Sequence, residues 1–154
     1  MVSIVIPTHT FIRKYVVHHS NTHDGVIHVS STDCWGIMML KILQKKASWE
    51  PNLKLKYEDN ITIKISEFFY SKTGFYLSKQ NITFFNTFLQ SQLEDALFYH
   101  ITTNKTGPHK TVIEKEIQSY LSLFGINEND KSLDSLLRAY SRWKKDHKYL
   151  IINQ

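Results

Sequence analysis

The longest regular pattern of hydrophobic and polar positions runs over residues 78–101. No glycine or proline interrupts this stretch, and its apolar residues recur at the 3.6-residue period of a helix. Ser78 stands at an N-cap position, where its hydroxyl can accept a hydrogen bond from the first turn. The pattern predicts a long helix whose apolar face packs against the rest of the chain. This face consists of Ile82, Phe85, Phe88, Leu89, Leu93, Ala96, Leu97 and His100.

The first part of the chain alternates between strand-like and helix-like patterns. Residues 2–6 and 26–29 are rich in β-branched side chains, which favour strands. Pro7 should end the first strand, because proline cannot donate to a central ladder. A short helix is expected around residues 11–16, and a second over 34–46, after a run of capping side chains.

A hairpin is expected after the second helix. Apolar and polar residues alternate over 53–57 and again over 61–65, and the polar residues 58–60 join the two runs. Each run would then have one apolar face and one face in water. Residues 67–76 are aromatic-rich but broken by a polar stretch, so we expect an irregular passage into the long helix.

The pattern of the C-terminal part predicts two further helices. Apolar residues follow a helical period over 113–124, and Gly125 stands where a left-handed residue ends a helix. After a short loop over 126–131, Ser132 can cap a last helix that extends to about residue 148. Its inward side chains would be Leu133, Leu136, Leu137, Tyr140 and Trp143.

These elements predict an α+β fold. It would contain a small mixed sheet with two helices in the N-terminal half, a long central helix and two C-terminal helices. The 154 residues are 42% hydrophobic and 21% charged, which is typical of a single domain. We expect one domain over 1–154, with an α/β half (1–76) and a helical half (77–154).

The chain has no pattern of an exported or membrane-spanning protein. It lacks a signal-peptide pattern at its start and a run of 18 apolar residues elsewhere. Cys34 is the only cysteine, so an intrachain disulfide is excluded. A cytoplasmic protein without a membrane partner is therefore expected.

The basic charge is concentrated at the C-terminal end. The formal net charge is +5, and residues 131–154 contribute +4 of it, with six Lys or Arg against two Asp. Arg138, Arg142 and Lys145 are spaced to line up on the outer face of the last helix, and Lys148 follows. These four residues form a candidate nucleic-acid-binding site. The alternative is a solvated face whose cations complement the helix dipole.

Four short steps of the sequence carry a resemblance to a group of known proteins. They are Ile6-Pro7, Tyr76-Leu77-Ser78, Phe124-Gly125-Ile126 and the run over 136–145. In this order they resemble small proteins encoded in prophages and transposable elements of Bacteroidetes. The resemblance implies a mobile-element origin and no particular activity.

Two functional hypotheses follow from the basic helix and the implied origin. The first is a non-enzymatic nucleic-acid-binding accessory or regulatory protein of a phage or mobile element, with DNA as its partner in preference to RNA. The second is a structural or adaptor protein of a phage, such as a virion or assembly component, whose basic end meets an acidic protein surface. The first would act in the cytoplasm of a bacterial host, and the second would be found in the virion.

A histidine-rich stretch is the only candidate for a metal site. Its spacing matches no metal-binding template, so we expect a surface loop and neither a metal nor another cofactor. The residues concerned are His18, His19, His23, Asp24 and His28.

Cys34 is the candidate nucleophile of the chain. It stands at the start of a predicted helix, where backbone N–H groups can lower a thiol pKa. A lone cysteine beside Trp35 is more typical of a small core residue, so we expect Cys34 to be buried. No glycine-rich phosphate loop or Gly-x-Ser-x-Gly motif is present. We therefore expect a protein that is not an enzyme and has no catalytic residues.

Two aromatic residues fall outside the apolar face of the long helix. Phe84 and Phe98 would stand among polar side chains there, so they need cover from elsewhere. The C-terminal helices can supply this cover, and so can a second subunit. A homo-oligomer and packing within one chain are both left open.

Overall fold

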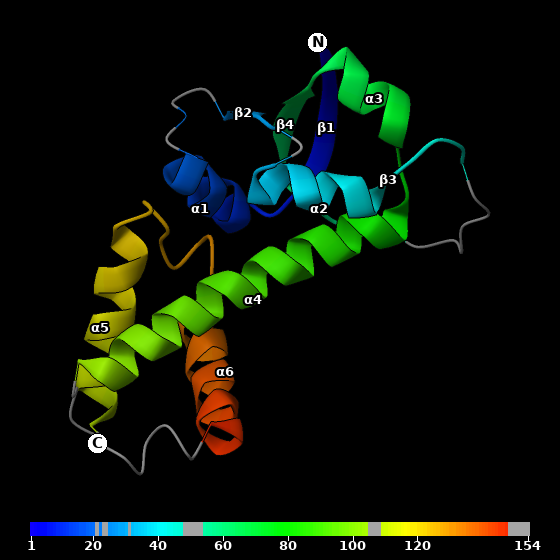
Figure 1. Ribbon diagram of the computed structural model, residues 1–154. Coiled ribbons are helices and arrows are strands. Elements are labelled where there is room, and N and C mark those ends of the chain that lie inside the picture. The colour runs from blue at the N-terminus through cyan, green and yellow to red at the C-terminus, as the bar shows by residue number, and fades with distance from the viewer. Residues whose placement is uncertain (21, 23–24, 31, 48–53, 105–108, 148–154) are drawn as a thin grey trace. The chain divides into compact units, whose positions relative to one another are not determined.

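The computed structural model has an α+β fold, as the sequence predicts (Figure 1). It describes residues 1–154 except 21, 23–24, 31, 48–53, 105–108 and 148–154. In chain order its elements are β1 (Val2–Thr8), α1 (Thr10–Ser20), β2 (Val26–His28), α2 (Cys34–Ile42), β3 (Leu43–Gln44), β4 (Asp59–Ile65), α3 (Glu67–Thr73), β5 (Tyr76–Leu77), α4 (Lys79–Thr103), α5 (Lys110–Ser122) and α6 (Leu133–Asp146).

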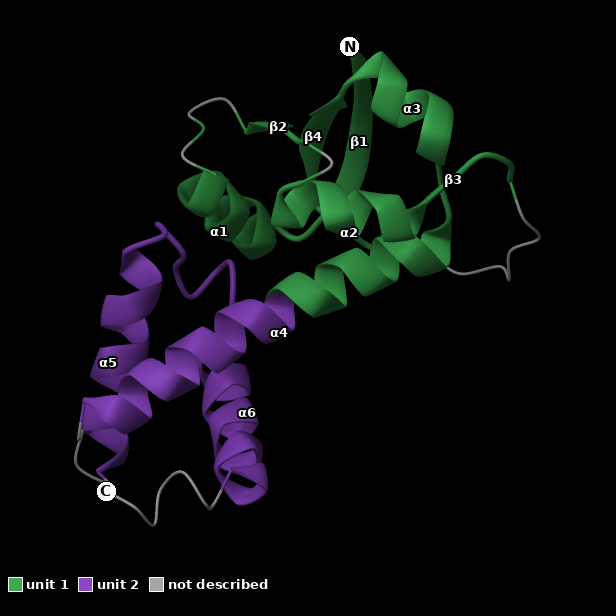
Figure 2. Ribbon diagram, in the orientation of Figure 1, with its two compact units in different colours: residues 1–89 green, residues 90–154 purple. Residues whose placement is uncertain are grey.

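The contacts within the chain divide it into two compact units (Figure 2). The first unit comprises residues 1–89 and the second residues 90–154. The boundary falls inside the long helix α4, so each unit contains part of that helix. The expected single domain over 1–154 stays a prediction.

The first unit is built on a mixed three-stranded sheet with the order β1-β4-β2. β1 pairs with β4 antiparallel, and β2 pairs with β4 parallel. Side chains alternate between the two faces of a strand, and one face of this sheet is buried. The buried residues on it are Ile4, Ile6, Ile27, Ile61, Ile63 and Ile65. A second sheet, which was not expected, joins β3 and β5 as an antiparallel pair.

The predicted hairpin is wrong. Residues 54–57 have no regular secondary structure, and Leu53 lies outside the described residues. The second predicted strand exists as β4, but β1 pairs with one of its edges and β2 with the other. Because a strand has only two edges, no position beside β4 is left for residues 54–57.

The predicted end of the first strand is also wrong, because β1 continues through Pro7 to Thr8. β1 is an edge strand, and an edge strand tolerates a residue without an N–H group.

The second predicted helix is shorter than expected. Asp33 caps α2 by accepting a hydrogen bond from the Gly36 N–H at 2.6 Å, and the helix ends at Ile42 instead of continuing to residue 46. The next two residues form β3, which pairs with β5. The amide of Asn81 donates to the Ile42 carbonyl at 2.7 Å, so a long-range contact holds this end of the helix.

Residues 67–76 are not the irregular passage that was expected, because α3 occupies most of this segment. Ser66 caps α3 by accepting a hydrogen bond from the Phe69 N–H at 3.1 Å. Gly74 follows with φ of +80°, and a Cβ there would collide with the backbone of Gln44. Glycine is therefore needed where the chain turns from α3 into β5.

The long helix was predicted correctly in its extent and in most of its apolar face. The Ser78 hydroxyl accepts a hydrogen bond from the Asn81 N–H at 3.1 Å and begins α4. Phe88 and Ala96 were expected on the buried face but are exposed. The residues of α4 that are buried are Ile82, Phe85, Asn86, Leu89, Leu93, Leu97, Phe98 and Ile101.

A buried polar side chain links α4 to β1 within the first unit. Asn86 is only 4% exposed and lies beside the end of β1. Its Oδ1 accepts hydrogen bonds from the Thr8 hydroxyl at 2.6 Å and the His9 N–H at 3.3 Å. Its Nδ2 donates to the carbonyls of Pro7 and Ile82, both at 2.9 Å. The amide group is therefore fully paired, which makes its burial acceptable.

Among the helices that the structure describes, none is long and apolar enough to cross a membrane.

Candidate nucleic-acid interface

The helix α6 is fixed at its start by a compact turn. Gly125 has φ of +66°, as the sequence predicts, and it ends the segment that begins with α5. The Asn127 N–H then donates to the Asp130 carboxylate at 2.9 Å, and the Leu133 N–H donates to Glu128 Oε1 at 3.0 Å. Asp130 thus stabilises the turn, and Glu128 supplies an acceptor for the first N–H group of the helix.

The inner face of α6 packs on the second half of α4 through aromatic rings. Phe98 lies 5.4 Å from the Tyr140 ring and 5.9 Å from the Trp143 ring, measured between centroids. The Trp143 indole N–H donates to Asp95 Oδ1 at 3.1 Å. This packing covers Phe98, whereas Phe84 remains 49% exposed. Tyr140 and Trp143 are buried, so they do not offer free faces on which bases could stack.

The outer face of α6 presents the predicted row of cations. Arg138, Arg142 and Lys145 are all exposed, on the side opposite the buried aromatic residues. Within the described part of the chain, none of the three forms an ion pair. Lys148, the fourth predicted residue, lies outside the described residues. The row is therefore available to an anionic partner along two turns of the helix.

Lys131 does not belong to this basic surface, although it contributes to the basic charge of the C-terminal end. Its ammonium group lies 3.2 Å from Glu94 Oε1, and the two side chains are only 11% and 18% exposed. An ion pair that is largely withdrawn from water keeps its partners together, so this cation is neutralised within the second unit.

Two shallow depressions lie along α6, and Arg138 lines both of them. The first is on the outer face of α6 itself, and it is lined by Ser132, Asp134, Ser135, Arg138 and Arg142. The second lies between α5 and α6, and it is lined by Lys110, Ile113, Asp134, Leu137, Arg138, Tyr140, Ser141 and Lys144.

The second depression brings in two cations that were not among the predicted site residues. Lys144 lies over the Tyr140 ring, with its nitrogen 4.9 Å from the ring centroid. Lys110 stands at the start of α5, more than twenty positions away in the sequence, and lies 3.5 Å from Glu114. No sequence signal links Lys110 to α6, because only the packing of the two helices places them together. Unlike the Lys131 side chain, the Lys110 side chain is 72% exposed despite its ion pair, so the basic surface reaches from α6 to the first turn of α5.

The histidine-rich stretch does not form a metal-binding cluster in the described residues. No group of three or more metal-ligating side chains was found there, and His23 and Asp24 lie outside the described residues. His18 and His19 stand at the end of α1 with ring centroids 5.9 Å apart. Burial lowers the pKa of His19, and repulsion from His18 lowers it further.

The prediction that Cys34 is buried is wrong, because its side chain is exposed. Cys34 is the first residue of α2, and the buried face of this helix is formed by Gly36, Met39 and Ile42. The thiol therefore points away from the core, although the residue type favoured a buried position.

A histidine and carboxylate pair at the start of α1 was not predicted from the sequence. His9 Nδ1 lies 3.0 and 3.2 Å from the two carboxylate oxygens of Glu58, and the Thr10 N–H donates to Glu58 at 3.4 Å. Burial alone would raise the pKa of Glu58, but the hydrogen bonds from His9 and Thr10 lower it below its ordinary value. The carboxylate lies at the N-terminus of a helix, where a negative charge is stabilised. The pair therefore holds the residues before β4 against α1.

Comparison of the chain with protein-family models, with curated proteins and with solved structures found no significant match.

Proposed function

We propose that this protein is a non-enzymatic nucleic-acid-binding accessory or regulatory protein of a phage or mobile element, which acts in the cytoplasm of a bacterial host. The observation that carries the proposal is the row of exposed cations on α6, formed by Arg138, Arg142 and Lys145, none of which is in an ion pair with another described residue. DNA is the proposed partner in preference to RNA.

The spacing of the row supports contact with a phosphate backbone. A helix rises about 1.5 Å per residue, so Arg138 and Lys145 are separated by about 10 Å along its axis. Phosphates of one DNA strand follow one another at a few ångströms, so each cation can meet its own phosphate. Arg138 and Arg142 add planar groups that bind phosphate through two hydrogen bonds. The extension of the basic surface to Lys110 and Lys144 lengthens the path available to the backbone.

The buried aromatic residues restrict the mode of binding. Because Tyr140 and Trp143 are occupied by packing on Phe98, they do not stack on unpaired bases. Contacts to the backbone of a duplex therefore fit this surface better than recognition of a single strand. Asp134 lies beside the row and would repel phosphates near the start of α6, so the end that carries Arg142 and Lys145 is the stronger part.

The test replaces Arg138, Arg142 and Lys145 together by glutamine, which keeps helix propensity and removes three positive charges. The matched control replaces Lys41, Lys45 and Lys46 by glutamine, since these exposed residues of the first unit carry the same total charge. Binding of a generic DNA duplex is then measured over a series of salt concentrations. We expect weaker binding by the α6 variant only, with the slope of log K against log salt reduced by up to about 2.7.

Three results would contradict the proposal. An α6 variant that binds as tightly as the parent protein would show that this face does not contact the nucleic acid. A parent protein that binds no duplex at low salt would favour the alternative of a structural or adaptor protein of a phage, with an acidic protein surface as its partner. Equal losses in both variants would indicate attraction by net charge alone, without a defined site.

A further inference from the structure

The hydrogen-bonding directions in the main sheet can be followed from one contact of β2. The Val29 N–H donates to the Lys64 carbonyl at 3.1 Å, so the backbone groups of Lys64 face β2. Successive residues of a strand direct their N–H and C=O groups to opposite sides. The backbone groups of Ile63 and Ile65 therefore face the other neighbour, β1.

The register of β1 on β4 then shows which residues of β1 are free. Ile4 lies opposite Ile63 and Ile6 opposite Ile61, so these two residues of β1 exchange hydrogen bonds with β4. The intervening residues Ser3 and Val5 direct their N–H and C=O groups away from β4. β1 is an edge strand, and in the described part of the chain these groups have no backbone partner.

Pro7 closes this open edge at one end. It also faces away from β4, and it has no N–H group to offer. Its carbonyl already accepts a hydrogen bond from Asn86 at 2.9 Å, which agrees with its outward direction. The open edge is therefore formed by the backbone of Ser3 and Val5, with two donors and two acceptors.

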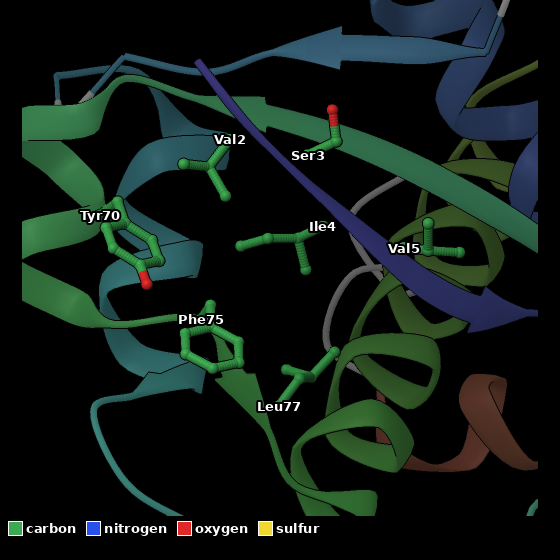
Figure 3. A pocket seen from close by; sticks show the side chains of 7 residues that line it. All are labelled: Val2, Ser3, Ile4, Val5, Tyr70, Phe75 and Leu77. Carbon is green, nitrogen blue, oxygen red and sulfur yellow. The ribbon is translucent and has the colours of Figure 1, made fainter.

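Apolar side chains lie on both sides of this edge. Val2 and Ile4 point toward Tyr70 and Phe75 across a shallow hollow that Ser3, Val5 and Leu77 also line (Figure 3). Side chains alternate along a strand, so Val5 belongs to the face of β1 opposite Ile4. Phe75 is 59% exposed and Val5 is 55% exposed. An added strand would cover apolar surface on both faces of the sheet.

We propose that the open edge of β1 pairs antiparallel with β1 of a second copy of this chain. In the matching register, Ser3 lies opposite Val5 of the second copy, and Ile4 lies on the twofold axis. Each of the two Ser3 and Val5 pairs exchanges two backbone hydrogen bonds, so all the free donors and acceptors of both edges are used. The two three-stranded sheets become one continuous six-stranded sheet.

The strand that pairs with the open edge belongs to a second copy because the backbone donors and acceptors of this edge are complementary to themselves. A twofold axis places each donor of one copy against an acceptor of the other, which is the requirement for a symmetric interface. Residues 2–6 carry no charged side chain, so the positive net charge of the chain does not place like charges at the contact. Edge strands are commonly protected by a lysine or a proline, and here neither occurs before Pro7.

A flexible peptide fits the same edge less well. The open edge offers only the backbone groups of Ser3 and Val5, and a disordered peptide would lose conformational entropy at every residue that it ordered there. The β1 strand of a second copy is already extended and held by β4, so it loses little.

The test is a Val5→Pro substitution in the full chain. This removes an N–H that faces away from β4, as Pro7 does naturally in the same strand, so the pairing of β1 with β4 is kept. The control is Val5→Thr, which keeps the N–H and the β-branched shape. Sedimentation equilibrium should give twice the chain mass of 18.1 kDa for the parent and the control. The proline variant loses two of the four proposed hydrogen bonds, so its dimer dissociation constant should rise by about 30-fold.

A second variant keeps the proposal testable if Val5→Pro does not fold. Val5→Lys adds a charge at an exposed position and keeps the backbone intact, so it should fold and form fewer dimers. Amide exchange gives a direct readout, because the Ser3 and Val5 amides should exchange more slowly as the protein concentration rises.

A parent protein that remains a monomer throughout the concentration range would overturn the proposal, and so would proline and lysine variants that dimerise as the parent does. The inference does not depend on nucleic-acid binding. The glutamine variant of α6 should dimerise normally, so a failure of either proposal is recognised separately.

Discussion

Replacing Asn86 by leucine should destabilise the protein more than any single surface change. Asn86 is 4% exposed and makes four hydrogen bonds, to Thr8, His9, Pro7 and Ile82. Leucine has the same branched shape and the same number of side-chain heavy atoms, so the substitution removes the polar group without opening a cavity. Its effect therefore reports on the polar link between α4 and β1.

The magnitude follows from the groups that lose a partner. A hydrogen bond within a protein contributes a net of about 1 kcal/mol, and an unsatisfied buried group costs about 1–3 kcal/mol. The Thr8 hydroxyl is fully buried and would lose its acceptor, Asn86 Oδ1. The loss of the remaining bonds is partly offset by burial of the leucine side chain. We expect a loss of about 3–5 kcal/mol in the free energy of unfolding, which is a large part of the total stability of a typical domain.

Urea unfolding followed by circular dichroism measures this loss. Thr8→Val is the matched variant, because it removes the hydroxyl that Asn86 accepts from and keeps the side-chain shape. In the double variant no Thr8 hydroxyl is left unpaired, so its cost should be less than the sum of the single costs by about 1–2 kcal/mol. A cost below about 1 kcal/mol for Asn86→Leu, or strict additivity with Thr8→Val, would refute this account of the buried amide.

Two further predictions concern Glu58 and Cys34. Because the pKa of Glu58 is lowered on folding from its ordinary value of 4.5, its carboxylate stabilises the protein above that pH, and the contribution is lost as the pH falls through the folded pKa. The free energy of unfolding of Glu58→Gln should therefore be lower than that of the parent at neutral pH and equal to it in strong acid. The loss should be less than about 1 kcal/mol, because the Glu58 side chain is 53% exposed. A difference that persists in acid would contradict this reasoning. Cys34 is exposed, so a thiol reagent should label the native protein at a rate within about tenfold of that for the unfolded chain. A native rate much lower than this would show that the thiol is covered.

The features that the sequence predicted correctly depend on neighbouring residues. The extent of α4 follows from an uninterrupted helical period after Ser78, whose hydroxyl caps the first turn. The left-handed backbone of Gly125 and the start of α6 at Ser132 follow in the same way from residue type. The helix α5 ends at Ser122, two residues before the predicted end. The outward direction of Arg138, Arg142 and Lys145 is set by the period of one helix. A local pattern determines these features because the forces that fix them act within a few residues.

Only the tertiary structure decided which distant segments meet. Residues 54–57 alternate as a strand does, yet both edges of β4 are taken by β1 and β2. Cys34 has a residue type that favours burial, but its position on α2 leaves it exposed. The ion pair of Lys131 with Glu94 and the depression shared by Lys110 and Arg138 join residues that no local period relates. Local geometry determines the extent of α4 and the outward row of cations on α6. Strand pairing and the composition of a surface depend instead on contacts between segments far apart in the chain, which a local pattern does not specify.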